Sequence, residues 1–517
     1  MSTTPIAAID IGTNSVHLVI ARRTESGTPE ILTREKAPVR LGSGARDMKR
    51  LAPEATQRAI DALGRFRQIA EAHDAEVVAV ATSAVREAEN QAEFIAAARD
   101  EAGVTVSVIS GVEEARLIHL GALGAVPAAG RRHLVIDIGG GSTEFVVGES
   151  TTPEVVRSLK LGHIRLTDRF FPDGRVTKKA VEECRKYVRA FLAPLALEIS
   201  DAGFELAIGC SGTIENLARM AALEAGDAVR TIDNLVLTRD GLRAVTRRLL
   251  DADDAAERAR TQGLDAHRAD VIVGGAILLR QIFKRLGIEE MVVSPAALRE
   301  GVVLDQIRRR SGSRDALHHL SDLRRSSVEA VALRYEEDLT HAQHATDLSL
   351  QLFDALVPTH GYGDAERDVL EAAGMLHNVG RFIAHAAHHK HSYYLVRHSE
   401  HLAGFNEHEI ELIAQVARYH RKSNPRPKHP EFAALDDDDR QRIRVLAGIL
   451  RIAIGLDRTY RRVVEGATVC LDDALTIALS VPSGADVELE IFTARERAGL
   501  LELALGTQVD FVVAEAS

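Results

Sequence analysis

One pattern of apolar and polar positions occurs twice along the chain. Residues 9–20 have the sequence Ile-Asp-Ile-Gly-Thr-Asn-Ser-Val-His-Leu-Val-Ile, and residues 136–147 have Ile-Asp-Ile-Gly-Gly-Gly-Ser-Thr-Glu-Phe-Val-Val. The two stretches align without a gap at an offset of 127 residues. Apolar runs on both sides of a glycine-rich turn predict a strand–turn–strand hairpin. The repetition predicts a duplicated fold, with one hairpin opening each half.

The rest of the pattern predicts α/β halves followed by a helical region. In the first half we expect strands at 6–11, 15–22, 30–39, 76–81 and 104–109, and helices at 53–73, 91–102 and 112–122. A meander followed by βαβ crossovers gives a mixed sheet. In the second half we expect strands at 133–138, 145–147, 155–161, 206–209 and 290–293, with helices at 177–199 and 299–309 and further helix up to 285.

Beyond the second half, residues 308–326 have the polar composition of a linker, and residues 328–455 are almost wholly helical by periodicity. The pattern then changes to short strands at 467–471, 476–479 and 487–490, plus residues 493–501, in a small α/β cap. We therefore predict four domains, at 1–126, 127–310, 311–462 and 463–517.

The aligned hairpins carry candidate chemistry. Asp10 matches Asp137, and His17 stands where Glu144 does. Successive glycines let backbone N–H groups approach an anion closely. Carboxylates beside such a site are unfavourable unless a cation lies between them, and phosphate together with Mg²⁺ resolves the conflict.

Composition narrows the classes of partner. The 517-residue chain has 45% hydrophobic and 27% charged residues, as in an ordinary globular protein. A net charge of −11 and 4% aromatic residues argue against nucleic-acid binding. Only three cysteines are present, and no signal peptide or membrane span is indicated, so we expect a cytoplasmic protein. Residues 381–430 are a basic island, with eight Lys/Arg, four Asp/Glu and nine His.

Two phosphate-binding hairpins facing each other across a cleft resemble the actin, sugar-kinase and Hsp70 ATPase superfamily. Seven sequence blocks, at 10–15, 81–90, 110–118, 137–144, 209–213, 268–276 and 298–301, make the resemblance narrower. In this order they resemble the exopolyphosphatase/guanosine-pentaphosphate phosphatase family over nearly the whole chain. The fold implied is α/β, with duplicated actin-like (ribonuclease H-like) domains, an all-α HD-like domain and a small α/β C-terminal domain.

The resemblance implies hydrolysis of a terminal phosphoanhydride, with Mg²⁺ or another divalent cation as cofactor. Glu114 matches the family's catalytic glutamate, and its place near a helix N-terminus is expected to keep it ionised. Asp137 and Glu144 match the pair that holds the metal and positions water. The candidate phosphate-binding residues are Asp10, Gly12, Thr13, Asn14, Ser15, Arg86, Gly139, Gly140, Gly141, Ser142, Ser211, Gly212 and Thr213.

Structural alternatives accompany several of these residues. Glu113 is expected to be solvated, and Asp10 could instead be tied to backbone amides of its hairpin. Arg86 could be a surface helix cap, and the turn at 211–213 could be structural only. Arg268 and Asp270 could form a salt bridge on one helix face.

The helical region resembles an HD-type phosphohydrolase domain. His341, His377 and Asp457 follow the order of its metal ligands, but Asn378 stands where that motif has Asp, so we expect hydrolytic activity to be lost. Blocks shared with long family members imply a polyphosphate channel at Lys390, His391, Arg421 and Lys422; the alternative is a solvated basic face with histidines packed inside helices. The resemblance also suggests a homodimer.

The leading hypothesis is an exopolyphosphatase that releases orthophosphate from inorganic polyphosphate. The alternative is a guanosine-pentaphosphate 5′-phosphatase, and one protein could do both. A sugar- or acetate-type kinase and a nonenzymatic phosphate sensor are less favoured, because Glu114, Asp137 and Glu144 form an intact set for hydrolysis.

Overall fold

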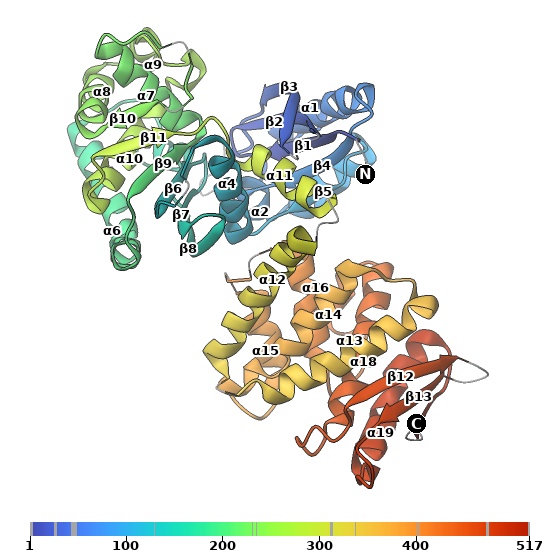
Figure 1. The fold of residues 1–517 in the computed structure, drawn as a ribbon. Coiled ribbons are helices and arrows are strands. Elements are labelled where there is room, and N and C mark those ends of the chain that lie inside the picture. Colours follow the sequence, from blue (N-terminus) through green and yellow to red (C-terminus); the bar gives the residue numbers. More distant parts are fainter. Residues whose placement is uncertain are drawn as a thin grey trace. The chain divides into compact units, whose positions relative to one another are not determined.

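The computed structural model describes residues 4–514, with gaps at 25–27, 43–48, 129, 230, 234, 311–313, 337, 400, 403 and 472–474. The chain forms two compact units, Met1–Leu317 and His318–Ser517 (Figure 1). Within the described ranges, no helix has both the length and the apolar character that crossing a bilayer requires.

The first sheet opens the first unit. Its strand order is β3-β2-β1-β4-β5. The strands are β1 (Ile6–Ile11), β2 (Ser15–Arg23), β3 (Pro29–Pro38), β4 (Glu76–Ala81) and β5 (Val106–Val108). The first three are antiparallel neighbours, and β4 and β5 continue in parallel. The expected meander and crossovers are therefore confirmed.

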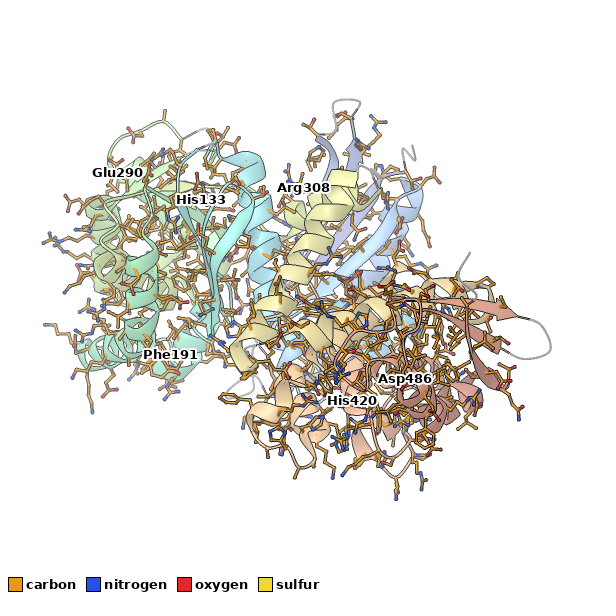
Figure 2. All side chains as sticks on the ribbon, turned by 60° about the horizontal axis from the view of Figure 1, so that its bottom comes forward. His133, Phe191, Glu290, Arg308, His420 and Asp486 are labelled. Atoms are coloured by element: carbon orange, nitrogen blue, oxygen red, sulfur yellow. The ribbon has the colours of Figure 1, made fainter. Side chains whose placement is uncertain are left out.

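The second sheet repeats this plan in the order β10-β11-β9-β6-β7-β8. The strands are β6 (His133–Ile138), β7 (Thr143–Glu149), β8 (Thr152–Leu159), β9 (Leu206–Cys210), β10 (Val236–Thr238) and β11 (Glu290–Val293). Figure 2 labels His133 and Glu290, at the starts of β6 and β11.

The internal repeat is confirmed at the level of strand register. Asp10 lies opposite His17 in the pair β1–β2, and Asp137 lies opposite Glu144 in the pair β6–β7. In the first turn the N–H of Gly12 donates to the carbonyl of Ser15 at 3.1 Å, and the N–H of Gly139 does the same to Ser142 at 3.0 Å. Both hairpins also have a parallel neighbour on the side of their first strand.

Two helices join the sheets through one apolar core. Helix α4 (Gly111–Ala125) comes from the first half and packs on β7 and β8, whereas α11 (Leu298–Arg310) comes from the second half and packs on β1 and β2. Their apolar residues share a core with both sheets, for example Val19 and Val146. Each half therefore lends a helix to the other, and the two halves form one unit.

The opposite faces of the sheets have cores of their own. The first is covered by α1 (Pro53–Ala72) and α3 (Gln91–Asp100), with the short α2 (Ser83–Arg86) beside β4. The second is covered by helices that include α5 (His163–Phe170), α6 (Lys178–Ala202), α7 (Ser211–Glu224), α8 (Arg239–Asp251), α9 (Ala255–Arg258) and α10 (Ile272–Leu286). The 3-10 turn η2 (Ala266–Arg268) precedes α10.

The second unit is helical apart from one small sheet. Its helices are α12 (Arg314–Tyr335), which begins in the first unit, α13 (Thr340–His360), α14 (Asp364–Leu376), η3 (Val379–Phe382), α15 (His388–Arg397), α16 (Glu407–Arg418), α17 (Pro430–Ala433), α18 (Asp437–Leu456) and α19 (Glu488–Leu505). Strands β12 (Gly466–Leu471), β13 (Leu475–Ser480) and β14 (Val509–Val513) form the sheet, in that order. All pack on one apolar core.

The structure changes two expectations about local structure. In the expected linker, residues 308–326, α11 continues to Arg310 and α12 begins at Arg314, and the boundary between the two units falls within this stretch. The strand expected at 487–490 is instead the start of α19, whose apolar residues continue to Leu505.

Candidate active site

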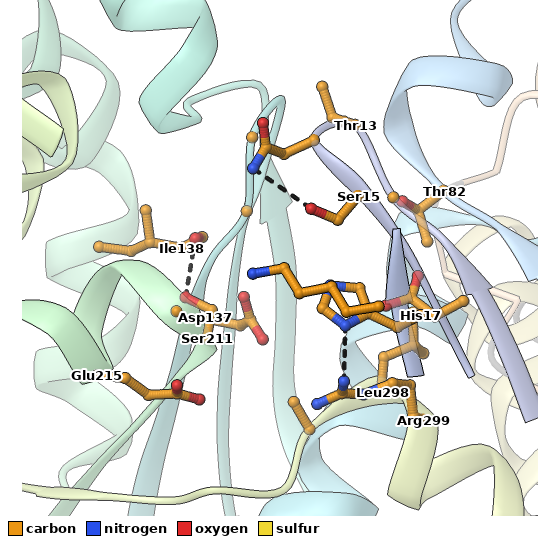
Figure 3. Close-up of a pocket in the computed structure, with 18 of the residues that line it drawn as sticks. Thr13, Ser15, His17, Thr82, Asp137, Ile138, Ser211, Glu215, Leu298 and Arg299 are labelled. Atoms are coloured by element: carbon orange, nitrogen blue, oxygen red, sulfur yellow. Dashed lines mark hydrogen bonds between the residues drawn. The ribbon is translucent and has the colours of Figure 1, made fainter. Parts of the chain in front are cut away.

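The turns of the two hairpins meet in the first unit. A cavity of about 520 Å³ is lined by both turns and by the ends of neighbouring elements (Figure 3). A Cβ atom added to Gly140 would lie 2.8 Å from the Cβ of Thr13, so the second turn has no room for a side chain there. Glycine at this position lets the two turns approach each other at backbone distance.

The turns expose N–H groups rather than carbonyl groups. The carbonyls of Thr13 and Asn14 accept backbone hydrogen bonds from residues 39, 40 and 42, and those of Gly139 and Gly140 accept from residues 163–165. Four N–H groups of the turns donate no hydrogen bond in the described part of the chain, apart from any within the strand ladders. They belong to Thr13, Asn14, Gly140 and Gly141. Such a set of free donors suits the oxygens of a phosphoryl group.

The structure brings together most of the candidate phosphate-binding residues. Those that line the cavity are Asp10, Gly12, Thr13, Asn14, Ser15, Gly139, Gly140, Ser142, Ser211 and Gly212. The N–H groups of Gly12 and Gly139 close their turns, so these two residues shape the site through their turns. The candidates outside the lining are Arg86, Gly141 and Thr213.

Glu114 lines the same cavity and is held from one side. It lies in the first turn of α4, whose N-cap residue, Ser110, accepts a hydrogen bond from the N–H of Glu113. Nη1 of Arg86 donates to Oε2 of Glu114 at 3.0 Å and also to the carbonyl of Ile109 at 2.8 Å. The hydroxyl of Thr82 donates to the same carboxylate. The block at 81–90 therefore serves to orient Glu114.

Burial raises the pKa of Glu114, and Arg86 opposes that shift. The helix N-terminus is expected to keep Glu114 ionised, and burial acts in the opposite direction at this side chain, which is only 6% exposed. A carboxylate whose pKa is raised towards neutrality is the better proton acceptor. Arg86 is not a surface cap, because its side chain is 16% exposed and points to this carboxylate.

Three further carboxylates gather near Glu114. Burial raises the pKa of Asp137 to about 8, with additional repulsion from Glu114 and Asp10. Burial raises the pKa of Asp10 to about 7, with Arg299 opposing. Burial, Glu114 and Asp137 raise the pKa of Glu144, whose Oε1 accepts from the Ser158 hydroxyl at 2.8 Å. Glu144 is buried behind the cavity lining.

This arrangement fits a hard divalent cation. Oδ1 of Asp10 is buried and has no hydrogen-bond partner, so Asp10 is not tied to its hairpin through that atom. Mg²⁺ prefers carboxylate oxygens, and it would favour the ionised form of acids that burial otherwise protonates. Among the described residues, no three side chains of His, Cys, Asp or Glu are already arranged as a metal site. Asp137 and Glu144 as metal ligands therefore stay a prediction.

Cationic side chains also line the cavity, and the candidate set lacked them. They are Arg34, Lys36, Arg219, Arg268 and Arg299. Arg299 donates to Nδ1 of His17 at 2.8 Å, as Figure 3 shows. Burial lowers the pKa of Lys36 and of Arg268, with their mutual repulsion adding to the shift of Lys36. The blocks at 268–276 and 298–301 contained Arg268 and Arg299 but did not indicate which way they point.

The turn at 211–213 divides between cavity and core. Ser211 has a positive φ of 80°, which is rare for serine, and its hydroxyl donates to the carbonyl of Ile138 at 2.9 Å (Figure 3). A Cβ on Gly212 would lie 2.3 Å from Nη2 of Arg268. Thr213 is buried, with its hydroxyl 3.1 Å from Nδ1 of His163. Ser211 and Gly212 thus face the cavity, and Thr213 packs behind it.

Two expectations about nearby charges are wrong. Glu113 is not solvated: it is 5% exposed and binds Arg116, which also binds Asp305 at 3.0 Å. This buried triad ties α4 to α11, a contact that the sequence of either helix alone does not reveal. In the described chain, Asp270 pairs with Arg40 at 3.1 Å and makes no ion pair with Arg268.

The second unit brings its predicted histidines together. Nδ1 of His341 lies 2.6 Å from Oδ2 of Asp457, and the rings of His341 and His377 are 5.9 Å apart. His388 and His420 stack at 5.2 Å, and both are buried, as is Asn378. Lys390 and Lys422 are exposed, whereas His391 and Arg421 are half-buried. Arg421 lies 3.1 Å from Nδ1 of His388, at the edge of the stacked histidines.

Comparisons with known proteins cover both units. The model of the Ppx/GppA phosphatase family matches residues 19–310, and that of Ppx/GppA phosphatase, domain III, matches residues 323–484. A relative from Aliivibrio fischeri, named guanosine-5′-triphosphate,3′-diphosphate pyrophosphatase, is 32% identical over 479 residues, which are 92% of this chain and 91% of the relative. A relative of the same name from Photobacterium profundum is 31% identical over 450 residues, 87% of this chain and 86% of its own.

Solved structures agree with these matches. An exopolyphosphatase from Cytophaga hutchinsonii has a TM-score of 0.56 and 32% identity, and the match covers 59% of this chain and 98% of that one. The Ppx/GppA family member from Aquifex aeolicus has a TM-score of 0.52 and 27% identity, covering 60% and 99%. The duplicated actin-like fold is thereby confirmed. The HD-like character of residues 311–462 stays a prediction.

Proposed function

Since this chain belongs to the Ppx/GppA phosphatase family and hydrolyses phosphoanhydride bonds, we propose that its main substrate is inorganic polyphosphate, from which it releases the terminal phosphate. One observation carries the proposal: Glu114, held by Arg86 and Thr82, faces a cavity lined by both glycine-rich turns. This places a proton acceptor beside a cradle of N–H donors, as phosphoryl transfer to water requires.

Each group has a defined part in this proposal. Glu114 accepts the proton of the attacking water, and Arg86 fixes the direction of its carboxylate. The free N–H groups of Thr13, Asn14, Gly140 and Gly141 donate to the oxygens of the terminal phosphoryl group. Arg268, Arg299 and Lys36 attract the anionic chain behind it. Mg²⁺ held by Asp137, Glu144 and Asp10 would offset the phosphate charge.

A second candidate substrate is guanosine pentaphosphate. Relatives that match about nine-tenths of the chain carry a name for that activity. The terminal phosphate of a 5′-triphosphate presents the same bond to the same donors. The guanosine would then lie beside the turn at Ser211 and Gly212, where Glu215 and Asn216 also line the cavity.

We propose further that the basic island binds long chains. Lys390 and Lys422 are exposed, and Arg421 and His391 are half-buried, so all four can meet a polyanion. Replacing Arg421 and Lys422 by alanine should raise KM more for long chains than for short ones. An equal increase for both would exclude this channel. We also propose that the protein is a cytoplasmic homodimer. Light scattering would test the dimer, because it measures molar mass in solution.

Two measurements test the proposal. Glu114→Gln keeps the shape but removes the proton acceptor, so kcat should fall about a hundredfold or more while KM changes little. Near-normal turnover would remove Glu114 from the mechanism. Phosphate release with Mg²⁺ from long-chain polyphosphate and from guanosine pentaphosphate, at matched concentrations of chain ends, decides between the substrates. Release from neither would exclude both.

A further inference from the structure

A second cavity in the first unit has a basic lining. Its volume is about 500 Å³, and its lining residues come from α6, α8 and α10. Helix α10 packs on both of the other two helices. It shares no lining residue with the active-site cavity. The lining includes six cations, which are Arg185, Arg189, Arg239, Arg243, Arg280 and Lys284. Only two carboxylates, Glu182 and Asp240, accompany them.

The cations stand in columns along the three helices. Arg185 and Arg189 are four residues apart on α6, as are Arg280 and Lys284 on α10. On α8 the same spacing repeats through 239, 243 and 247, all arginine. Residues at i and i+4 lie side by side on a helix, and like charges there destabilise it. Three such columns facing one cavity concentrate positive charge there and attract anions.

Only part of this charge is neutralised within the described chain. Glu182 pairs with Arg189 at 3.0 Å and with Arg185 at 3.8 Å, and Arg239 pairs with Glu289 at 2.6 Å. Arg243, Arg280 and Lys284 make no ion pair or side-chain hydrogen bond among the residues described. Burial together with repulsion from Arg185, Arg243 and Arg247 lowers the pKa of Arg280. Arg243 and Lys284 are exposed and Arg280 is half-buried, so all three can reach an anion in the cavity.

We propose that this cavity is a second binding site for a linear polyphosphate chain, separate from the site of hydrolysis. The ligand class follows from the lining. Guanidinium groups match phosphate geometry. Phe283 is the single aromatic residue of the lining and is 1% exposed, so a nucleic-acid base has nothing to stack on. This inference rests on the proposed function, because it gives the polymeric substrate a further point of attachment, in addition to the active site and the basic island.

A second attachment point has a kinetic consequence. A long chain that is held at this cavity stays near the protein after each phosphate is released, so its effective concentration at the active site is raised. A chain of three phosphates can occupy one site only. The cavity would therefore favour long substrates without touching the bond that breaks.

Binding of end-labelled polyphosphate of about 100 units to the full chain, measured by fluorescence anisotropy in EDTA, tests the proposal. The triple variant Arg243→Gln, Arg280→Gln, Lys284→Gln should bind about tenfold more weakly. The slope of log K against log salt should fall by about 2, since each lost phosphate contact removes roughly 0.7. The control triple Arg65→Gln, Arg175→Gln, Lys178→Gln makes the same change in net charge at exposed cations outside both cavities, and should weaken binding less than about twofold.

A charge-retaining triple, Arg243→Lys, Arg280→Lys, Lys284→Arg, separates binding from folding and should retain most of the affinity. Equal losses in the pocket and control triples would overturn the proposal, as would single-stranded RNA competing as well as polyphosphate at equal phosphate concentration. The proposal would also be overturned if the pocket triple lost as much affinity for tripolyphosphate as it does for the long chain. Because binding in EDTA needs no turnover, failure of phosphate release would contradict the proposed function and leave this measurement intact.

Discussion

The two hairpins β1–β2 and β6–β7 share their backbone structure but carry side chains of different chemistry. Their turns close with the same hydrogen bond, and their aspartates occupy the same register position. The residue opposite the aspartate differs: it is His17 in the first hairpin and Glu144 in the second. The duplicated backbone explains why both turns offer N–H donors, and the difference between the hairpins lies in the side chains.

The two partner residues lead to opposite electrostatics. Burial and the neighbouring cations Arg299 and Lys36 hold the pKa of His17 well below its usual range, so its neutral ring accepts a hydrogen bond from Arg299. Burial raises the pKa of Glu144 instead, and its neighbours Glu114 and Asp137 raise it further. The residue opposite the aspartate thus positions a cation in the first hairpin and adds an acid to the group around Glu114 in the second. The hairpins therefore divide the work: His17 bears on substrate attraction through Arg299, and Glu144 bears on the acids beside Glu114, which itself lies on α4.

Replacing His17 and Glu144, one at a time, by glutamine is the strongest test of this difference between the hairpins. Glu144→Gln removes a charge from the acid cluster, and kcat should fall about a hundredfold or more. His17→Gln keeps an acceptor for Arg299, so the loss should stay below about tenfold, the scale of one weakened hydrogen bond. Steady-state kinetics of both variants at saturating Mg²⁺ measures the difference. Equal losses would refute the division of labour between the hairpins.

Substitutions of Arg86 test how the acids around Glu114 are controlled. Arg86→Gln removes the cation that opposes the raised pKa of Glu114, so the acidic limb of the profile of kcat/KM against pH should move to higher pH. The rate at neutral pH should fall about tenfold, because the carboxylate loses both its charge partner and its fixed direction. Arg86→Lys retains the charge and should restore the limb but not the full rate. A purely structural role would lower the rate without moving the limb.

The hairpins also show how far sequence alone reaches. The aligned stretches predicted both hairpins, strands and turns included, because a hairpin depends on residues close together in the chain. The block at 110–118 identified Glu114, but the expectation that Glu113 is solvated failed. Burial of Glu113 depends on Arg116 and on Asp305, which is 192 residues further along the chain.

Charged residues lining the cavity show the same limit. Arg268 and Arg299 were visible in two sequence blocks, yet nothing local indicated that one faces Gly212 and the other His17. Likewise, the serine- and arginine-rich composition at 308–326 resembled a linker, although α11 and α12 cover most of it. Composition indicates whether the side chains of a segment could remain in water, but tertiary contacts decide which of them are buried.

The two matched aspartates should differ in how they make stability depend on pH. Without divalent cations, the folded state holds protons on Asp137 up to about pH 8 and on Asp10 up to about pH 7, whereas the unfolded chain releases them near pH 3.8. The folded state then binds more protons, so stability should fall as pH rises from about 5 to 8. Asp137→Asn should flatten this decline more than Asp10→Asn does. Thermal unfolding of the full chain in EDTA measures it.

Addition of Mg²⁺ provides the control for this pH effect. A cation among the carboxylates favours their ionised form, so the decline between pH 5 and 8 should diminish. In Asp137→Asn the added cation should stabilise less. A pH dependence that is the same in both asparagine variants and insensitive to Mg²⁺ would show that these aspartates do not carry it.

The smallest expected effect concerns the contact between the turns themselves. Gly140 corresponds to Thr13 in the repeat, and an added Cβ at Gly140 would meet the Cβ of Thr13 at 2.8 Å. Gly140→Ala should therefore cost about 1–3 kcal/mol of overpacking, seen as a Tm lowered by several degrees. Gly139→Ala is the matched control, because its added Cβ would lie 3.2 Å from the nearest atom, within its own hairpin. Adding Thr13→Gly should restore the stability of Gly140→Ala but not that of Gly139→Ala, since only the clash at Gly140 crosses between the hairpins. Rescue of both variants, or of neither, would show that the turns do not touch at this point.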